Sequence, residues 1–404
     1  MSCCGPAGQP AGLKLAEVLR LGLAVAPPKL PTHHWKILRA LLACRTLALG
    51  GHRYDCQQCG QSHFVPHSCR NRHCPLCQGQ AAHRWLEQQE QALLPVPYFH
   101  LVFTLPHVLN PLIQQNQRAL YNLLFAAASQ TLLQFGQNRF GVQLGITAVL
   151  HTWSQTLLDH YHLHCIVTGG GLASGGSRWV GASGPYLFAV RALSTVFRGK
   201  FCAGLQQLQT EQQLQFHGQL SSLARPKAFA QLRRQAACQK WVVFAKRPFA
   251  GPKQVLAYLS RYTHRVALNS RRLLALDEHQ QTVTFAWKDY AEGARHKTMT
   301  LEAKEFLRRF CLHLLPKGLV KIRHFGFLSN RQRRTKLAQA RALLQPQTVP
   351  ECPPNDAQPR ALSTAPATMP GRVCPYCGSD RLWLVEIVPA IRLPCSAVPT
   401  LDSS

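Results

Sequence analysis

Acidic residues are scarce in this sequence. Asp and Glu total 17 of 404 residues, against 46 Lys and Arg, and the formal net charge at pH 7 is +29. Such an excess calls for a polyanionic partner, with nucleic acid as the leading candidate and an anionic membrane surface as the alternative. The same scarcity argues against a two-metal site built from carboxylates, because few of them are available.

Three further absences narrow the range of possible functions. The sequence has no run of 18 or more apolar residues, so we expect no membrane-spanning helix and no membrane partner. It has no GxxxxGK[ST] phosphate loop, so we expect no nucleotide cofactor. Its start, MSCCGPAGQP, lacks the basic and apolar regions of a signal peptide, which favours the cytoplasm. In that reducing compartment the 16 cysteines favour metal ligation over disulfides.

Two Cys-x-x-Cys pairs form the most specific local motif. Their spacing is C-x2-C-x14-C-x2-C, and the four residues are Cys56, Cys59, Cys74 and Cys77. Two such turns can hold a structural zinc ion with tetrahedral geometry. The alternative is that the four cysteines are unrelated. Cys69 and His73 lie in the same loop and could replace one ligand or bind a second ion.

A third Cys-x-x-Cys pair lies near the C-terminus. Cys374 and Cys377, in the sequence CPYCG, form half of a zinc ribbon. Cys352 and Cys395 could complete it, although their spacing is irregular. The alternative is a frayed tail that binds no metal.

Two histidines alternate with apolar residues on a predicted strand. Because side chains alternate between the two faces, His162 and His164 share one face. The preceding segment 145–153 also has strand composition and could fold back as a hairpin, which would bring His151 to the pair. Three neutral imidazoles can hold one divalent ion. The alternative is that these are three of 19 histidines without a ligand role.

Residues 252–266 have the apolar spacing of a helix. Tyr258 and Tyr262 stand four positions apart and therefore on one helix face. Arg261 and Arg265 lie beside them and could bind phosphate oxygens. A pair of tyrosines at this spacing is usually packing, which is the alternative. Near a cation, however, a tyrosine hydroxyl can attack phosphorus and form a covalent phosphotyrosine.

Two basic segments are candidates for contacts with a nucleic-acid backbone. In the loop SCRNRHCP we expect Arg70 and Arg72 to point outward toward phosphates, and a solvated basic loop is the alternative. The segment 317–336 interleaves Phe325 and Phe327 with cations, a composition that suits stacking on bases. A basic edge strand is the alternative here. The candidate phosphate ligands of this segment are Arg331 and Arg333.

Periodicity and turn residues predict the remaining elements. Helices are expected over 13–25, 32–47, 80–94, 111–135 and 302–315. Strands are expected over 98–105, 145–153, 273–276, 282–287 and 298–301. The glycine run 169–171 is expected to end the second strand of the histidine hairpin. The segment 172–235 has mixed strand and helical character.

Together these motifs resemble a known family. The cysteine-rich SCRNRHCPLC, then HLHC on a strand, then YLSRYTHR on a helix, are similar to the two-tyrosine rolling-circle insertion-sequence transposases of the HUH endonuclease class. The resemblance covers most of residues 33–335. It implies an α+β fold in which helices flank a ferredoxin-like antiparallel sheet, with a small N-terminal zinc module.

The resemblance also implies roles for individual residues. Tyr258 and Tyr262 would be the nucleophiles that cut single-stranded DNA, leaving a 5′-phosphotyrosine and a free 3′-hydroxyl. His162 and His164 would be metal ligands on a central strand, with His151 in a third-ligand position. The family implies Mg²⁺ or Mn²⁺ at the histidines, whereas three imidazoles by their softness alone suggest a later transition metal.

Five segments follow from these motifs. We predict an N-terminal extension over 1–32, a zinc-binding DNA-recognition domain over 33–95, a catalytic domain over 96–340, a flexible linker over 341–372 and a C-terminal tail over 373–404. The expected partners are single-stranded DNA and hairpins at the element ends. We make no prediction of an oligomeric state.

Two other function classes stay open. A non-catalytic, zinc-dependent nucleic-acid-binding protein would use the histidines and tyrosines for packing. A carboxylate-dependent transposase or nuclease would use, for example, Asp159, Asp289 and Glu302. The first predicts DNA binding without cleavage, and the second predicts that loss of the tyrosines is harmless.

Overall fold

The protein is described by a computed structural model over nine ranges of the chain. They are residues 13–27, 29–90, 92–182, 184–246, 248–249, 254–255, 266–290, 292–345 and 373–391. The chain divides into two compact units. The first comprises Met1–Ile37 and Arg72–Gln345, and the second comprises Leu38–Asn71 and Pro346–Ser404. Across the described ranges, no helix has the length and apolar character needed to cross a membrane.

The largest sheet of the first unit is antiparallel, with the strand order β11-β4-β5-β3-β7 and β6 paired to β5. Its strands are β3 (Tyr98–Thr104), β4 (Val142–Trp153), β5 (Asp159–Ala173), β6 (Trp179–Gly181), β7 (Val242–Ala245) and β11 (Ile322–Gly326). The two longest, β4 and β5, form the hairpin that the sequence predicts. They lie in the middle of the sheet, so both of their edges are paired.

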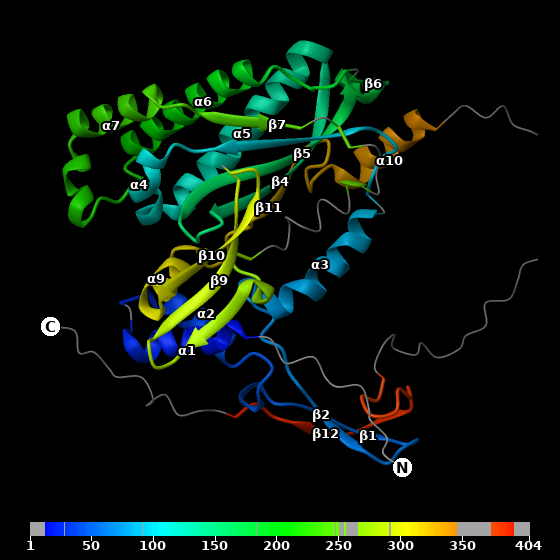
Figure 1. Ribbon diagram of the computed structural model, residues 1–404. Helices are drawn as coiled ribbons and strands as arrows, with labels where there is room; N and C mark the ends of the chain where they lie inside the picture. The colour runs from blue at the N-terminus through cyan, green and yellow to red at the C-terminus, as the bar shows by residue number, and fades with distance from the viewer. Residues whose placement is uncertain are drawn as a thin grey trace, which may run out of the picture. The chain divides into compact units, whose positions relative to one another are not determined.

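Helices cover one face of this sheet (Figure 1). They are α4 (Asn110–Gln115), α5 (Gln117–Phe140), α6 (Val190–Thr210) and α7 (Pro226–Cys238). The core between the layers includes Phe103, Phe197 and Trp241, with Leu163 from β5 buried among them. Because side chains alternate along β5, the burial of Leu163 on this face turns His162 and His164 to the other.

The predicted helix over 111–135 is interrupted at Asn116. The backbone of Asn116 leaves the helical region, with φ −120° and ψ 38°. Its side-chain Oδ1 accepts from the Gln215 amide at 2.7 Å, and its Nδ2 donates to the Gln215 carbonyl at 2.9 Å. The Asn116 amide still donates to the Leu112 carbonyl at 3.1 Å, so the side-chain pairing with Gln215 is added at the break, and the apolar spacing alone did not reveal it.

A smaller antiparallel sheet of the first unit has the order β10-β9-β8. Its strands are β8 (Leu273–Asp277), β9 (Thr282–Asp289) and β10 (Arg295–Glu302), and α9 (Ala303–Leu312) follows directly. The rings of Phe285 and Phe306 pack at a centroid distance of 6.0 Å, which fixes α9 on this sheet. Helix α1 (Leu15–Val25) packs closely on α9, because a Cβ at Gly22 would lie only 2.8 Å from the Ala303 carbonyl oxygen.

The remaining helices include two that begin or end away from the predicted residues and one, over residues 333–344, where no helix was predicted. They are α2 (Thr32–Leu42), α3 (Pro75–Glu90) and α10 (Arg333–Leu344), and short 3-10 turns occur at Leu47–Leu49, His107–Leu109, Ser174–Gly176, Gly218–Ala224 and Ser270–Arg272. Helix α2 ends five residues before the predicted end. Helix α3 starts at a proline, which suits the first turn because its missing N–H has no partner there.

The glycine run 169–171 does not end β5, so that expectation is wrong. The strand continues to Ala173, and β6 pairs with it over this run. Gly170 has φ +135°, and a Cβ there would lie 2.5 Å from the Val180 carbonyl oxygen. The glycines are needed because two neighbouring strands approach the backbone closely, not because the strand stops.

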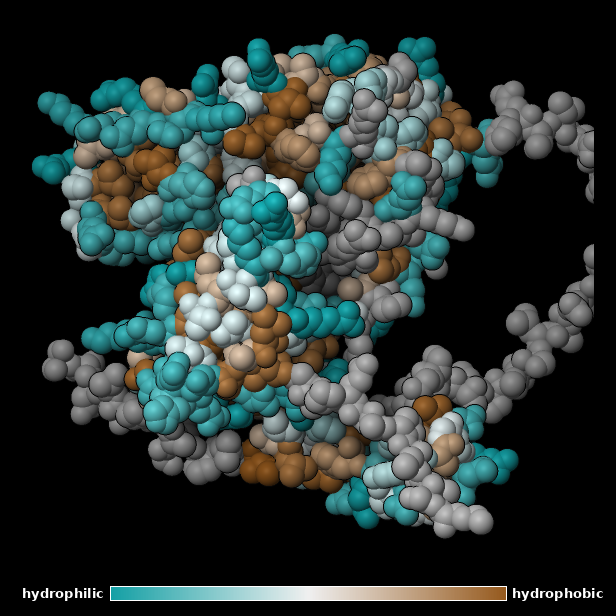
Figure 2. Space-filling view, in the orientation of Figure 1, coloured by the Kyte–Doolittle hydropathy of each residue, from teal (hydrophilic) through white to brown (hydrophobic). Residues whose placement is uncertain are grey.

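The second unit contains a three-stranded antiparallel sheet with the order β12-β1-β2. Its strands are β1 (Gly51–Cys56), β2 (Ser62–Pro66) and β12 (Leu382–Val388). Figure 2 shows brown apolar side chains over β12, whose exposed members are Trp383, Leu384, Val385 and Ile387. The predicted α+β class is confirmed, with antiparallel sheets and helices in one chain.

Candidate functional site

Three histidines come together on β4 and β5. His151 and His162 stand opposite each other in the strand register, and His164 follows two residues later. One ring nitrogen of each lies within 4.8 Å of the others, and all three side chains are buried. The predicted hairpin is therefore confirmed, and it brings these imidazoles to the face of the sheet opposite the helices.

Hydrogen bonds orient the rings of His162 and His164. His162 Nδ1 lies 2.8 Å from the His160 carbonyl oxygen. A carbonyl oxygen only accepts, so Nδ1 carries the proton and, in the neutral ring, the lone pair remains on Nε2. His164 Nδ1 lies 3.0 Å from His100 Nε2. These are the outer hydrogen bonds that commonly fix the tautomer and orientation of a metal-binding imidazole.

His100 is a member of the site that sequence analysis missed. It lies on β3 opposite Ile166 of β5, and its ring stacks on His164 at a centroid distance of 5.2 Å. Burial, with a smaller contribution from the charge of Lys246, lowers the pKa of His100 to about 3, so its ring is neutral at pH 7. In the sequence, His100 stands in the predicted strand 98–105 (YFHLVFTL). Its place in that strand indicates a role at the histidine site only once β5 is known to be the neighbour of β3.

A cavity of about 590 Å³ opens onto the histidines. Besides these histidines, its lining includes Trp153, Lys246, Trp287, Lys288 and Tyr290, and the described lining residues include no carboxylate. Two ammonium groups and aromatic faces beside imidazoles suit a phosphodiester with its attached bases. The arrangement can hold a cation and an anionic substrate side by side.

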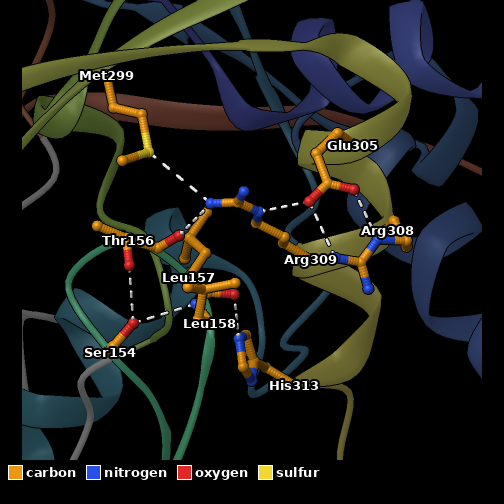
Figure 3. Close-up of polar contacts among 9 residues, drawn as sticks. All are labelled: Ser154, Thr156, Leu157, Leu158, Met299, Glu305, Arg308, Arg309 and His313. Carbon is orange, nitrogen blue, oxygen red and sulfur yellow. Dashed lines mark hydrogen bonds and ion pairs between the residues drawn. The ribbon is translucent and has the colours of Figure 1, made fainter.

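The turn that joins β4 to β5 is held from outside the hairpin (Figure 3). Arg309 of α9 donates from Nη1 to the Thr156 carbonyl at 3.1 Å, and His313 donates from Nε2 to the Leu157 carbonyl at 3.0 Å. Leu157 is fully buried with φ +62°, a conformation that a non-glycine residue rarely adopts. These donors stabilise the turn and therefore the position of His151 relative to His162.

Glu305 orients the arginine that reaches this turn. Its carboxylate accepts from Arg309 Nε at 2.6 Å, and from Arg308 Nε at 2.6 Å and Nη2 at 2.9 Å. Figure 3 shows Arg309 extending from α9 toward Thr156, whereas Arg308 contacts only Glu305 among the residues drawn. The hydrogen bonds from Arg308, followed by those from Arg309, lower the pKa of Glu305 to about 2.

The three candidate carboxylates of the alternative nuclease do not form one site. Asp289 pairs with Arg295 and Glu302 pairs with Thr282, which places the two acids at opposite ends of the β9–β10 ladder. Seven residues of strand separate them, or about 24 Å. Asp159 instead accepts from the Tyr161 hydroxyl at 2.8 Å. These three acids therefore do not share a metal ion.

The predicted zinc ligands are divided between the two units. Cys56 and Cys59, in the second unit, are grouped with Cys374 and Cys377, and the four sulfur atoms lie within 4.8 Å of one another. Cys74 and Cys77 are buried in the first unit, just before α3 and within it. The sequence spacing identified each pair but not its partner. The assignment of Cys74 and Cys77 as zinc ligands stays a prediction.

The predicted DNA-contacting arginines also differ in their surroundings. Arg70 is exposed at a left-handed turn position with φ +51°. Arg72 does not point outward as expected, because its guanidinium donates to the carbonyls of Leu315, Pro316 and Leu319. Burial lowers the pKa of Arg72. Arg331 is exposed, and half-buried Arg333 donates to Gln89 at 2.9 Å.

The expectation that Phe327 stacks on bases is wrong, whereas that for Phe325 stays a prediction. Phe327 is fully buried and packs against Trp179 at a centroid distance of 5.8 Å. Phe325 packs against Phe125 at 6.3 Å. Phe327 therefore lies in the protein core, whereas Phe325 is only partly buried. β11 is an edge strand of the main sheet, paired with β4, as the alternative of a basic edge strand expected. The tyrosine helix cannot be compared in this way, since Tyr258, Tyr262, Arg261 and Arg265 lie outside the described residues.

Comparisons with known proteins find similarity to transposases. Residues 145–336 match a family described as "Putative transposase", and residues 22–105 match one described as "Transposase zinc-binding domain". The chain is 42% identical over 370 residues to "Putative transposase y4qJ" of Sinorhizobium fredii, covering 90% of this chain and 92% of that relative. It is 31% identical over 293 residues to "Transposase for insertion sequence element IS801" of Pseudomonas savastanoi pv. phaseolicola, covering 72% and 69%. No solved structure matches the chain.

Proposed function

Because this chain belongs to the IS91/IS801 family of insertion-sequence transposases, we propose that it cleaves and rejoins single-stranded DNA at the element ends through a 5′-phosphotyrosine. The observation that carries the proposal is the buried cluster of His151, His162 and His164 beside a cavity lined by lysines and aromatic rings. An alternative role in binding alone would leave this cluster without a use.

The histidines are proposed to hold a divalent ion, Mg²⁺ or Mn²⁺. The three imidazoles fit a cation. In His162, Nδ1 donates to the His160 carbonyl, so the lone pair of Nε2 is available to a metal ion. When bound, such an ion would neutralise charge on the scissile phosphate. His100 is proposed to accept the outer proton of His164, which keeps the inner nitrogen of His164 available. Lys246 and Lys288 would attract the DNA backbone into the cavity.

Tyr258 and Tyr262 are the proposed nucleophiles. The phenol oxygen of one forms a bond to phosphorus while the bond from phosphorus to the 3′ oxygen breaks. The phenol proton leaves, and the 3′ oxygen takes up a proton to become a free hydroxyl. The phosphotyrosine ester retains the bond energy for rejoining, so no nucleotide cofactor is needed. The second tyrosine could receive a second strand before the first is released.

The basic residues and the zinc module are proposed to hold the DNA. Arg70, Arg261, Arg265, Arg331 and Arg333 would bind phosphates, and the strong excess of positive charge would make this binding weaken as salt increases. We propose single-stranded ends and end hairpins as the ligands, in the cytoplasm. Zinc at the cysteines would stiffen the module rather than take part in cleavage.

The test is formation of a covalent protein–DNA adduct. Single-stranded DNA carrying an element end is labelled at its 3′ terminus, because the fragment that keeps that terminus is the one joined to tyrosine. The full chain is incubated with this DNA and Mg²⁺ or Mn²⁺, then run on a denaturing gel. We expect a labelled band at the protein's position that disappears when both Tyr258 and Tyr262 are replaced by Phe.

The matched control is Tyr186→Phe, which changes an exposed tyrosine that does not line the cavity. It should form as much adduct as the original chain. Adduct in the double Tyr258→Phe, Tyr262→Phe variant would contradict the tyrosine assignment. DNA binding without any adduct in the unaltered chain would instead favour a non-catalytic binding protein.

A further inference from the structure

The turn that follows β1 has the backbone structure of a metal-binding knuckle. The Cys56 amide donates to the Gln61 carbonyl at 3.0 Å, and the Gly60 amide donates to the Cys56 carbonyl at 2.9 Å. Gly60 has φ +68°, which glycine adopts without strain. The backbone amides of Cys59 and Gln58 donate hydrogen bonds to the Cys56 sulfur, as expected of such a turn.

The turn before β12 repeats this construction. The Cys374 amide donates to the Ser379 carbonyl at 2.7 Å, and the Gly378 amide donates to the Cys374 carbonyl at 2.9 Å. Gly378 has φ +75°. Each hydrogen bond joins the same relative positions as in the first turn. The two Cys-x-x-Cys-Gly segments are therefore two copies of one turn, one from each end of the chain.

The sulfur atoms of the two turns face one another. Cys56 Sγ lies 3.6 Å from Cys377 Sγ, and Cys59 Sγ lies 3.6 Å from Cys374 Sγ. A disulfide would need about 2.05 Å, so these are not bonded pairs. Four sulfurs about 2.3 Å from a central zinc ion would be about 3.8 Å apart in a tetrahedron, close to the observed separations.

Within residues 373–391, the contacts that hold this segment in the second unit are mainly those of the turn and of a strand pairing. β12 pairs with β1 over six residue pairs, and the Gln57 amide donates to the Arg381 carbonyl at 3.0 Å. An exposed ion pair joins Arg53 to Glu386 at 3.1 Å. Most side chains of β12 are exposed, so burial of apolar surface contributes little. A small sheet without a sizeable core commonly depends on a metal.

We propose that Cys56, Cys59, Cys374 and Cys377 bind one structural zinc ion, so that the C-terminal turn completes a zinc ribbon begun more than 300 positions earlier. Two of the four ligands lie beyond residues 22–105, the range that matches the zinc-binding family. The C-terminal segment is then a part of the zinc module and not a tail. This inference does not depend on the phosphotyrosine mechanism.

The first test is the zinc content of the full chain, measured by mass spectrometry of the metal after gel filtration. The variant C374S/C377S should lose one zinc ion per chain, and C56S/C59S should lose the same one. The variant with all four changes should lose no more than either pair, because both pairs hold one ion. The matched control C202S/C238S, two cysteines of α6 and α7, should keep the full content.

The second test keeps all cysteines and does not depend on a variant folding. A protease site is inserted between Gln345 and Val373 of the full chain, and the cut protein is passed over a gel-filtration column. The C-terminal fragment should elute with the rest in zinc-containing buffer and separate after treatment with a chelator. Unchanged zinc in C374S/C377S, loss of two ions in the fourfold variant, or elution independent of the chelator would each overturn the proposal.

Discussion

The histidine site and the proposed zinc ribbon are assembled in opposite ways. His151 and His162 are 11 positions apart on one hairpin, whereas Cys56 and Cys377 are separated by 321 positions. Closing the longer loop costs about 3 kcal/mol more chain entropy than closing the shorter one. Structural zinc binding contributes on the order of 10 kcal/mol, which is more than enough to offset that cost. Local pairing places the histidines, while a metal is expected to hold the two cysteine pairs.

The two sites also differ in the contacts that support them. The histidine hairpin lies in a sheet packed on helices, and its turn accepts hydrogen bonds from Arg309 and His313. The four cysteines lie at the end of a small sheet whose strand β12 is mostly exposed. The histidine geometry should therefore persist without a metal, and the cysteine geometry should not.

Loss of a histidine ligand should have the largest effect. His164→Ala removes one of three proposed ligands and should lower the rate of adduct formation at least about a hundredfold, with little change in the fold. The measurement is the covalent-adduct assay with a circular dichroism spectrum of each variant. His279→Ala, at an exposed position of the β8–β9 turn, is the matched control and should behave like the original chain. Equal activity of both variants would refute a ligand role for His164.

Removal of the arginine that reaches the hairpin turn should come next. Arg309→Ala leaves the Thr156 carbonyl without its donor and breaks the bond to Glu305, and should lower the free energy of unfolding by about 1–3 kcal/mol. Urea denaturation measures the change. Arg308→Ala removes a neighbouring partner of Glu305 that does not reach the turn, and should cost less than about 1 kcal/mol. Equal losses of unfolding free energy in the two variants would show that the hydrogen bond from Arg309 to the turn does not cause the loss.

The outer partner of His164 should matter less than the ligand itself. His100→Leu removes the ring that contacts His164 Nδ1 and should weaken Mn²⁺ binding about 10- to 100-fold. Isothermal titration calorimetry gives the affinity directly. His100→Asn keeps a polar group at the position and should recover part of it. An unchanged affinity in His100→Leu would assign His100 to packing.

A pH titration should reveal the contribution of Glu305. Its pKa is lowered from 4.5 to about 2, so its ion pairs contribute stability that is fully present above about pH 4.5. That contribution is lost as the pH falls through about 2. Between these values Glu305→Gln should show a shallower fall of the urea midpoint than the original chain does. Parallel curves would mean that Glu305 is equally easy to protonate in the unfolded chain.

The smallest effect is expected at the surface of the second unit. Arg53→Ala removes an ion pair with Glu386 in which both side chains are about half exposed, at 45% and 53%. Solvent screens such pairs, so the change in stability should be below about 0.5 kcal/mol, and zinc content should not change. Thermal denaturation with a metal assay checks both. A loss of zinc would mean that strand pairing, and not the thiolates, holds the C-terminal segment.

Sequence reasoning was reliable where contacts are local. The strand over 98–105, the histidine hairpin and the strands of the small sheet all appear in the structure within a few residues. It was less reliable where a partner lies far away, as at Asn116, at the glycines of β5 and at the buried Phe327. In each of these cases the local residue pattern suited two conformations, and a remote contact chose between them.

Local residue patterns specify which short segments present ligands. The alternation of His162 and His164, the nearby strand that carries His151, and the spacing within each cysteine pair all follow from backbone periodicity over a few residues. Which segments meet depends on contacts between distant parts of the chain. The tertiary structure brought His100 to His164 and Cys374 and Cys377 to Cys56 and Cys59. The physical reason is that spacing specifies a turn or a strand face, whereas the partner of that turn depends on how distant strands pair.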